Sequence, residues 1–158
     1  MALKFKLTSE TTTWLGRTLF RIEALIDFGN VSKGDKGGFV EAENNVSQDG
    51  NAWVYGDAQV YGNARVCGNA QVSGDAWVYG DAQVLRSICC ATRSDGYTFT
   101  VAPDKDGNFV VIARCRYFTF KQAKVHWTET RGGTQLGDES LQILKHLEAM
   151  VKIRHGNL

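Results

Sequence analysis

Small apolar residues recur through the middle of the chain with a period of six. Six consecutive hexapeptides span residues 50–85 and share the pattern Gly-Asp/Asn-Ala-x-Val-x. Ala and Val stand two positions apart in each repeat, so both side chains lie on the same face of a strand. The glycine and the Asp or Asn that follows it tolerate a positive φ, which favours a corner between strands. The pattern therefore predicts a solenoid with a narrow interior of Ala and Val.

Apolar and polar positions also alternate before the repeats. Apolar residues alternate with polar ones over residues 3–7, and residues 18–25 form a second run with the character of a strand. These runs predict an N-terminal strand-turn-strand cap over residues 1–40. The solenoid domain is expected to follow it over residues 41–85.

The pattern changes after the repeats and predicts an α+β module over residues 86–158. Three strand-like runs joined by Asp-Gly turns favour an antiparallel meander. Two helices follow, the first with Thr119 as its N-cap and a Gly-Gly pair at its end, the second with Asp138 as its N-cap. Their apolar positions recur at helical spacing and are expected to pack on the meander. The expected strands are 88–92, 97–102 and 109–113, and the apolar positions of the second helix are Leu141, Ile143, Leu144, Leu147, Met150 and Val151.

The hexapeptide motif resembles the repeat of left-handed parallel β-helices, a superfamily that includes trimeric acyltransferases. This resemblance implies a mainly β fold with three strands in each turn of eighteen residues, so that position i lies beneath position i+18. Two turns make a short solenoid, to which Val40 and Val46 add a partial turn before the period breaks by two residues at 47–49. A stack this short needs caps and neighbouring chains to cover it, and the resemblance implies a homotrimer. The expected pairs are Tyr61 with Tyr79, Gln59 with Trp77, Trp53 with Gln71, Tyr55 with Ser73, Arg65 with Gln83 and Cys67 with Leu85.

Composition and charge narrow the classes of function. The net charge is only +1, with −5 on residues 38–85 and +4 on residues 86–158, which is too weak to indicate general nucleic-acid binding. The chain has no run of about eighteen apolar residues and no signal-peptide pattern, so we expect an intracellular protein without membrane contact. The cysteines contain no CxxC pair and, together with His126, match no common zinc spacing, so we expect neither a metal nor a cofactor.

Five aromatic side chains point away from the expected interior of the solenoid, namely Trp53, Tyr55, Tyr61, Trp77 and Tyr79. Large rings clustered on a surface usually contact a partner or a ligand. Self-association is one interpretation, and an external partner or a ligand in a groove between chains is the other. Arg114 and Arg116 stand next to Tyr117 and Phe118 and have the chemistry to pair with a phosphate or an acidic partner, although arginines at a strand edge are also commonly solvated.

The sequence supports no catalytic assignment. Acyltransferases of the superfamily usually use a histidine near the coils as a base, whereas the three histidines of this chain all follow the repeats. His126 could act as a base only from the first predicted helix, next to the coil of a neighbouring chain. We therefore favour a protein that is not an enzyme and keep acyl transfer as an alternative.

Two further segments resemble proteins of phages and prophages. Residues 27–58, DFGNVSKGDKGGFVEAENNVSQDGNAWVYGDA, resemble the entry sequence of small hexapeptide-repeat proteins of phages. Residues 117–148 resemble a C-terminal module that is appended to such proteins. Together with the exposed aromatic side chains and the lack of a catalytic constellation, this resemblance favours a phage-type oligomer that binds a host macromolecule, a protein or protein complex of the bacterial cytoplasm, and inhibits an antiviral defence. An acyltransferase is one alternative. A sponge that holds a small nucleotide signal between chains, by stacking on Trp53, Tyr61 or Trp77, is the other.

Overall fold

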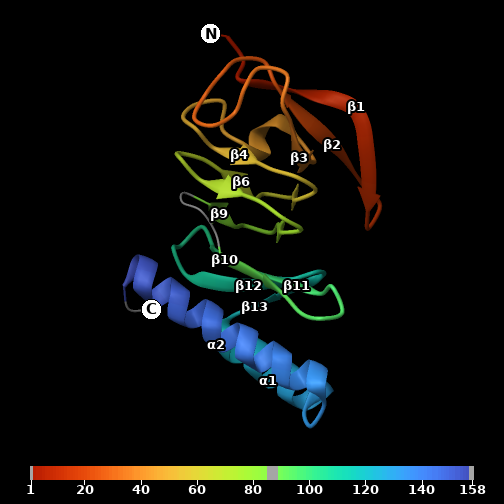
Figure 1. Cartoon of the computed structure of the whole chain (residues 1–158), viewed down its shortest axis with the longest axis vertical. Coiled ribbons are helices and arrows are strands. Elements are labelled where there is room, and N and C mark those ends of the chain that lie inside the picture. The colour runs from red at the N-terminus through yellow and green to blue at the C-terminus, as the bar shows by residue number, and fades with distance from the viewer. Residues whose placement is uncertain (1, 85–88, 157–158) are drawn as a thin grey trace. The chain divides into compact units, whose positions relative to one another are not determined.

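The chain folds into two compact units, and the computed structural model describes residues 2–84 and 89–156 (Figure 1). The first unit spans Met1–Ile88 and contains the repeats, and the second spans Cys89–Leu158. The described residues of the first unit form strands and a short 3-10 helix, whereas those of the second form strands and two long helices. Leu85, the expected partner of Cys67, and Ile88, the expected first residue of the strand 88–92, lie outside the described residues.

The repeats form short parallel strands that stack in coils. Residue 53 pairs with residue 71, residue 59 with 77, and residue 65 with 83, so position i lies against position i+18. All the alanines and valines that the repeat places inside are 0% exposed, as the sequence predicts. The strands are β4 (Trp53–Val54), β5 (Gln59–Val60), β6 (Arg65–Val66), β7 (Gln71–Val72), β8 (Trp77–Val78) and β9 (Gln83–Val84).

Glycine is required at the corners because the backbone turns sharply there and successive corners approach closely. Gly50 has a φ of +69°, and a Cβ atom at this position would lie 2.6 Å from the carbonyl oxygen of Gly68 in the next coil. Any other residue would be strained in its backbone and would collide with that corner. The positive φ recurs at all six repeat glycines, whereas a Cβ atom at Gly56 would lie 3.7 Å from its nearest neighbour, so the turn requires glycine throughout and the close approach adds to this at Gly50.

A three-stranded antiparallel cap precedes the coils. Its strands are β1 (Phe5–Trp14), β2 (Arg17–Ala24) and β3 (Lys36–Val40), and β3 continues the sheet into the solenoid by pairing in parallel with β5. The turn between β1 and β2 is Leu15-Gly16, and both residues have a positive φ, as in tight hairpins. In Figure 1 the far end of this hairpin lies beside the coils. The first strand is longer than the sequence pattern predicts.

The partial turn expected before the repeats is present. Val40 pairs with Val60 and Val46 with Val66, an offset of twenty residues where the repeats have eighteen. The 3-10 helix η1 (Glu43–Asn45) lies between the two leading valines. The chain takes up the two extra residues after Val46, where the sequence predicts a break in the period.

The first coil has backbone carbonyl groups that no earlier coil can bond. Within the stack such groups accept from the coil before, as the carbonyl of Ala70 accepts from the N–H of Trp53 at 3.0 Å. The carbonyl of Ala52 is the equivalent group in the first coil, and it accepts from the ammonium of Lys4 at 2.8 Å. Lys4 also donates to the carbonyl of Gly50 at 3.3 Å and is only 2% exposed. A buried cation thus takes the place of a strand on this side.

The other two sides of the first coil are capped differently. The side-chain amide of Asn45 donates to the carbonyls of Gly62 and Ala64 at 3.1 and 2.9 Å. On the third side, β3 and the residue after it donate backbone N–H groups to the carbonyls of Ala58 and Val60. The cap therefore supplies a donor on every side of the triangle, which matters because an unsatisfied buried carbonyl costs free energy.

Arg21 fixes the cap to a corner of the solenoid. Its guanidinium donates to the carbonyl oxygens of Gly37 in β3 and Gly56 in the first coil, at 2.7 and 3.1 Å. The same group pairs with Glu10 of β1 at 2.6 Å and with Asp57 at 3.1 Å. One side chain of β2 therefore joins β1, β3 and the first coil.

The second unit combines a four-stranded antiparallel sheet with two helices. The sheet packs against both helices through buried residues that include Phe99, Val111, Trp127 and Leu144. The three-stranded meander and the two helices agree with the sequence pattern, whereas the fourth strand, β13, is additional. The elements are β10 (Cys89–Thr92), β11 (Thr98–Pro103), β12 (Phe109–Ala113), β13 (Arg116–Phe118), α1 (Phe120–Arg131) and α2 (Gln135–His155).

One of the two predicted helix caps is right and the other is wrong. Thr119 caps α1 as predicted, because its hydroxyl accepts from the N–H of Gln122 at 3.2 Å. The cap of α2 is Thr134, whose hydroxyl accepts from the N–H of Gly137 at 3.1 Å, and the helix therefore begins at residue 135. Asp138, the predicted cap, lies in the first turn, where its carboxylate interacts favourably with the helix dipole.

Replacing Lys4 by Met tests the capping role of its ammonium. Lys4→Met keeps most of the side-chain stem but removes the donor to the carbonyls of Gly50 and Ala52, so we expect the free energy of unfolding to fall by about 1–3 kcal/mol. Lys6→Met is the control, since Lys6 is half exposed and forms a surface pair with Glu23 that is worth less than about 1 kcal/mol. Urea denaturation measures both. Equal effects of the two substitutions would contradict the capping role.

The same cap predicts a dependence of stability on pH. Burial lowers the pKa of Lys4 from 10.5 to about 8, and the charge of Asp49 opposes this shift. Between these two values the folded protein binds fewer protons than the unfolded chain, so the contribution of Lys4 to stability rises with pH. We expect the difference in unfolding free energy between wild type and Lys4→Met to grow by on the order of 2 kcal/mol from pH 7 to pH 10. A difference that shrinks over this range would show that the pKa of Lys4 is not lowered.

Candidate functional site

Two of the aromatic side chains predicted to face a partner are covered by their own chain. Trp53 is 1% exposed, and its ring contacts those of Phe5 and Phe28 at centroid distances of 6.1 and 5.3 Å. Tyr61 is 5% exposed, and the guanidinium of Arg17 lies 5.8 Å from its ring centroid. The expectation that these two rings are exposed is wrong, because the N-terminal cap packs over them.

The other three rings, Tyr55, Trp77 and Tyr79, are half-buried. Tyr79 stacks on Tyr61 with centroids 5.0 Å apart and planes 9° apart, which confirms the pair expected from the eighteen-residue offset. Trp77 contacts Trp14, at the end of β1, with centroids 4.5 Å apart. Sequence reasoning missed Trp14, because the repeat indicates the side on which a ring lies but not which distant segment folds over it.

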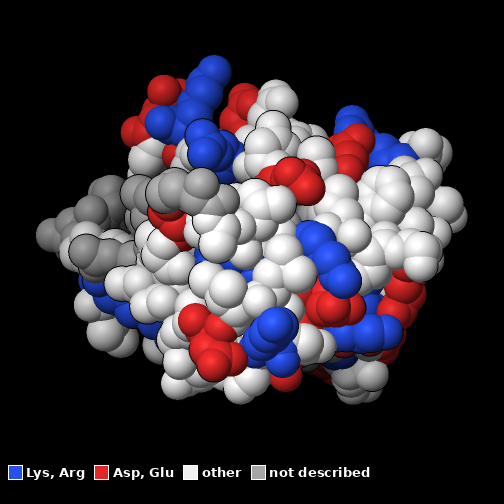
Figure 2. All heavy atoms as spheres, turned by 90° about the horizontal axis from the view of Figure 1, so that it is seen from above, with Lys and Arg blue, Asp and Glu red and all other residues white. Residues whose placement is uncertain are grey.

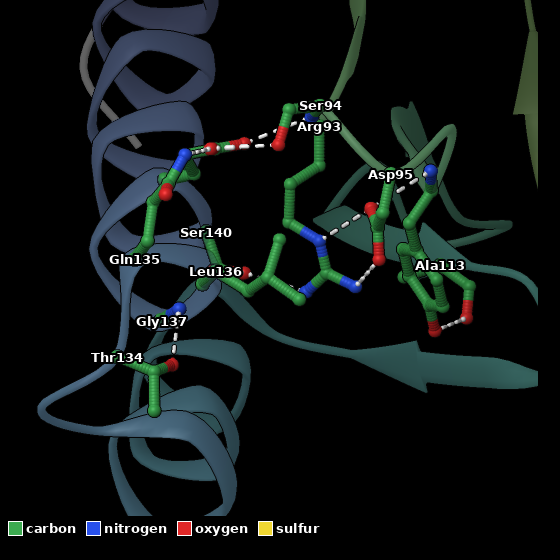
Figure 3. A network of polar contacts seen from close by, with 11 residues as sticks. Arg93, Ser94, Asp95, Ala113, Thr134, Gln135, Leu136, Gly137 and Ser140 are labelled. Carbon is green, nitrogen blue, oxygen red and sulfur yellow. Dashed lines mark hydrogen bonds and ion pairs between the residues drawn. The ribbon is translucent and has the colours of Figure 1, made fainter.

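A polar network holds the turn between β10 and β11 against α2 (Figure 3). The guanidinium of Arg93 donates to both carboxylate oxygens of Asp95, at 2.8 and 2.6 Å, and to the hydroxyl of Ser140 at 3.0 Å. The backbone N–H and the hydroxyl of Ser94 both donate to Glu139 at 2.8 Å. The hydrogen bonds from Arg93 lower the pKa of Asp95 to about 2, so this pair is charged at neutral pH. Each nitrogen of the Arg93 guanidinium has a partner inside the unit, and we assign the residue a structural role.

Tyr97 connects this network to the turn between β12 and β13. Its hydroxyl donates to the carbonyl of Ala113 at 2.9 Å, immediately before the turn. Burial raises the pKa of Tyr97, which keeps the hydroxyl protonated and able to donate. The guanidinium groups of Arg93 and Arg114 lie 4.7 and 5.1 Å from its ring centroid. Tyr97 therefore fixes the base of the turn on which the two predicted site arginines stand.

Arg114 and Arg116 are exposed, and the next residue, Tyr117, is 37% exposed. Arg114 has a φ of +52°, a left-handed conformation that costs a residue other than glycine about 1–3 kcal/mol. Within residues 2–84 and 89–156, neither guanidinium donates a hydrogen bond or forms a salt bridge. Two cations without an acid partner among the described residues thus lie two positions apart in the chain at this turn, and a guanidinium has the chemistry to bind carboxylate or phosphate oxygens. Their binding role stays a prediction.

His126 lies on α1 close to this turn. Its ring contacts those of Phe118 and Trp127 at centroid distances of 5.1 and 4.8 Å. Burial lowers the pKa of His126, the charge of Arg116 lowers it further, and Glu129 opposes both, so the imidazole is neutral at pH 7. In the described part of the chain the imidazole donates no hydrogen bond to a carboxylate, so aromatic packing sets the orientation of this ring.

The charged side chains do not gather by sign on the face shown in Figure 2. Basic and acidic groups are interspersed there among uncharged ones. Among the described residues, no group of three or more His, Cys, Asp and Glu side chains is placed to hold a metal ion. None of the described helices combines the length and the apolar composition needed to cross a bilayer. The pair of arginines at the β12–β13 turn remains the best-defined candidate site.

Comparison with known proteins supports the architecture of the first unit. The family described as YdcK beta solenoid repeat matches residues 58–70 and again residues 70–86. The first match begins next to β5, and the two together run past β9. Over this range β5 pairs in parallel with β8, and β6 with β9. No curated protein matches the chain. The protein is mainly β, with a β-solenoid repeat and a C-terminal helical part.

Proposed function

We propose that this protein is a non-enzymatic binding protein that captures an acidic protein partner through Arg114, Arg116 and Tyr117. The solenoid carries the second unit and supplies association between chains. One observation carries the proposal: the exposed guanidinium groups of Arg114 and Arg116 pair with no acid among the described residues, at a turn where Arg114 has a left-handed conformation.

Arginine is well suited to this role. Its planar guanidinium pairs with a carboxylate through two parallel hydrogen bonds and is weakly hydrated. Arg93 and Asp95 form a pair of this kind in the same unit, with distances of 2.8 and 2.6 Å. Arg93 is satisfied by its own chain, whereas Arg114 and Arg116 have no such acid among the described residues. Among the exposed arginines of this unit these two lie closest in the chain, two positions apart and next to Tyr117, and we assign them to a partner.

The position of Arg114 in the turn gives separate support. Ala113 pairs with Arg116, so Arg114 and Cys115 form a two-residue hairpin loop, and such a loop requires a positive φ, as at Leu15 in the β1–β2 hairpin. Here the hydrogen bond from Tyr97 to the carbonyl of Ala113 holds the start of the turn. Glycine would relieve the strain but would also remove the charge. The hairpin explains the backbone conformation, and the charge that stands here in place of a glycine supports a binding role.

The resemblances noted in the sequence suggest where the partner is found. They support a phage-type protein that binds a protein component of a bacterial antiviral defence in the cytoplasm and inhibits it. They also support left-handed coils and a homotrimer. Tyr55 and Arg65 lie on sides of the solenoid other than the one that contacts Trp14, and we assign these sides to contacts between chains.

The geometry gives less support to the two alternative functions. A nucleotide sponge would stack a base on Trp53, Tyr61 or Trp77, yet the first two rings are buried against their own chain. An acyltransferase would use His126 as its base, yet the contacts around that ring are with Phe118 and Trp127. Neither alternative is favoured by a specific contact of the described residues.

Capture from a bacterial lysate tests the proposal. The double variant Arg114→Gly with Arg116→Gln removes both charges and relieves the left-handed backbone, so we expect its stability to stay within about 1 kcal/mol of wild type. Wild type should retain one protein in stoichiometric amount, and the variant less than about a tenth of it, since each charge-assisted hydrogen bond contributes about 1.5–3 kcal/mol. Capture should also weaken as salt is raised. Quantitative mass spectrometry of the retained protein measures the effect.

A matched control removes the same charge elsewhere in the unit. Lys145→Gln with Lys152→Gln changes two exposed positions of α2 and should leave capture unchanged. Equal recovery by the variant that lacks both arginines would contradict the assigned site. The absence of any stoichiometric partner from wild type would contradict the proposed function itself.

A further inference from the structure

The outward side of α1 carries one row of three side chains. The buried positions of this helix, Phe120, Ala123 and Trp127, face the core of the second unit. Lys121, Val125 and Glu129 follow one another at intervals of four residues, which places them in a row on the opposite side. Val125, in the centre of the row, is 48% exposed. The row is therefore an apolar residue with a cation four residues before it and an anion four residues after it.

Neither charge of this row forms an ion pair within the part of the chain that the structure describes. A neighbouring cation of the same helix, Lys124, pairs with Glu148 of α2 at 2.6 Å. Lys121 and Glu129 form no salt bridge with any residue that the structure describes. They cannot pair with each other, because eight residues of helix separate them by about 12 Å.

The row crosses a shallow depression in the surface with a volume of about 560 Å³. A depression of this kind can receive a ridge of side chains from another helix. It is lined by Thr119, Lys121, Gln122, Val125, His126 and Glu129.

We propose that a second copy of this chain docks here, with the two α1 helices antiparallel and a twofold axis at Val125. Such an axis brings each Lys121 opposite Glu129 of the second copy and brings the two Val125 side chains together. Twofold interfaces use the same patch on both chains, and this row is complementary to itself only about its centre. The position of the apolar residue midway between opposite charges is what identifies the occupant as another copy.

The charges also select the antiparallel orientation. In a parallel pair centred on Val125, Lys121 would face Lys121 and Glu129 would face Glu129. Like charges at such distances repel, whereas the antiparallel pair forms two ion pairs and also opposes the helix dipoles. The row therefore disfavours the wrong orientation as well as favouring the right one.

The contact is small and should be weak. A helix of twelve residues is about 18 Å long, and its outward side covers far less than the roughly 800 Å² per partner found in stable complexes. We therefore expect association that depends on protein concentration and weakens with salt. The row does not include Arg114 or Arg116, so this contact and the proposed function are tested by different residues.

Exchange of the charges tests the pairing. Lys121→Glu alone and Glu129→Lys alone each place like charges at both contacts, and each should weaken self-association of the full chain by about tenfold or more. A mixture of the two single variants should restore it, because every contact between unlike chains is again a pair of opposite charges. The double variant with both changes in one chain should restore it too. Sedimentation equilibrium over a range of concentrations measures all four samples.

A cysteine at the axis tests the position of the contact. Val125→Cys, in a background with the exposed Cys90 and Cys115 changed to Ser, should form a disulfide between two copies on mild oxidation, since the two Cβ atoms meet at the axis. Ile153→Cys in the same background is the control, because residue 153 is more exposed, at 78%, but lies outside the row. Peptide mapping by mass spectrometry identifies the linked residues.

Four results of these experiments would overturn the proposal. Self-association unchanged in both single variants would show that the row makes no contact between copies. Failure of the mixture to regain what the single variants lose would rule out the antiparallel pair. Equal cross-linking at positions 125 and 153 would show random collision. If the single variants lose capture of a lysate protein while self-association persists, the occupant is that protein and not a second copy.

Discussion

The first unit depends on one constraint: the backbone carbonyls of the first coil need hydrogen-bond donors, because no earlier coil supplies them. Each later coil receives its hydrogen bonds from the coil before it, as the carbonyl of Ala70 does from Trp53. The first coil has no such neighbour, and Lys4, Asn45 and strand β3 each serve one side of the triangle. Once β3 lies on one side, β2 and β1 extend the same sheet, and their hairpin is long enough to bring Trp14 against Trp77. The burial of the aromatic side chains is therefore a consequence of how the end of the stack is closed.

The basic side chains of this structure fall into two kinds, according to whether their acceptors lie in the same chain. In the first unit, Lys4 and Arg21 have acceptors among the backbone carbonyls and carboxylates of their own fold. In the second, Arg93 is satisfied by Asp95 and Ser140, whereas Arg114 and Arg116 are exposed at a turn held in place by Tyr97. A structural arginine has its partners in its own chain. An exposed arginine on a strained but well-supported turn is available to another molecule.

The sequence predicts the regular parts of this structure because each rests on local chemistry. The period of the repeat is enough to place all the interior alanines and valines, since a strand has only two faces. The pairing of Tyr61 with Tyr79 also needed the turn of eighteen residues that the family resemblance implies. Thr119 is recognisable as a cap because its hydroxyl stands directly before the first residue of the helical pattern, where it can accept from a free backbone N–H. Thr134 was missed because the apolar positions of the second helix begin only at Leu141, so Asp138 was the nearer candidate. The burial of Trp53 and Tyr61 could not be predicted in this way, because the segments that cover them are far away in the chain. The strain at Arg114 was equally hidden, since it results from pairing between β12 and β13 and not from the residue type.

The weak contact proposed at α1 gains strength if the chain already associates through its solenoid. A single pair of short helices held by Val125 and two surface ion pairs binds poorly, because each pair is solvated and ordered at a cost in side-chain entropy. In a homotrimer, three such rows would belong to one particle, and after the first contact the others would form at a high effective concentration. That gain is available only where the geometry allows several rows to meet at once. With that geometry, the proposed association through the solenoid and the proposed contact at α1 would be energetically coupled, because a chain released from the trimer would also lose the high effective concentration of the other rows.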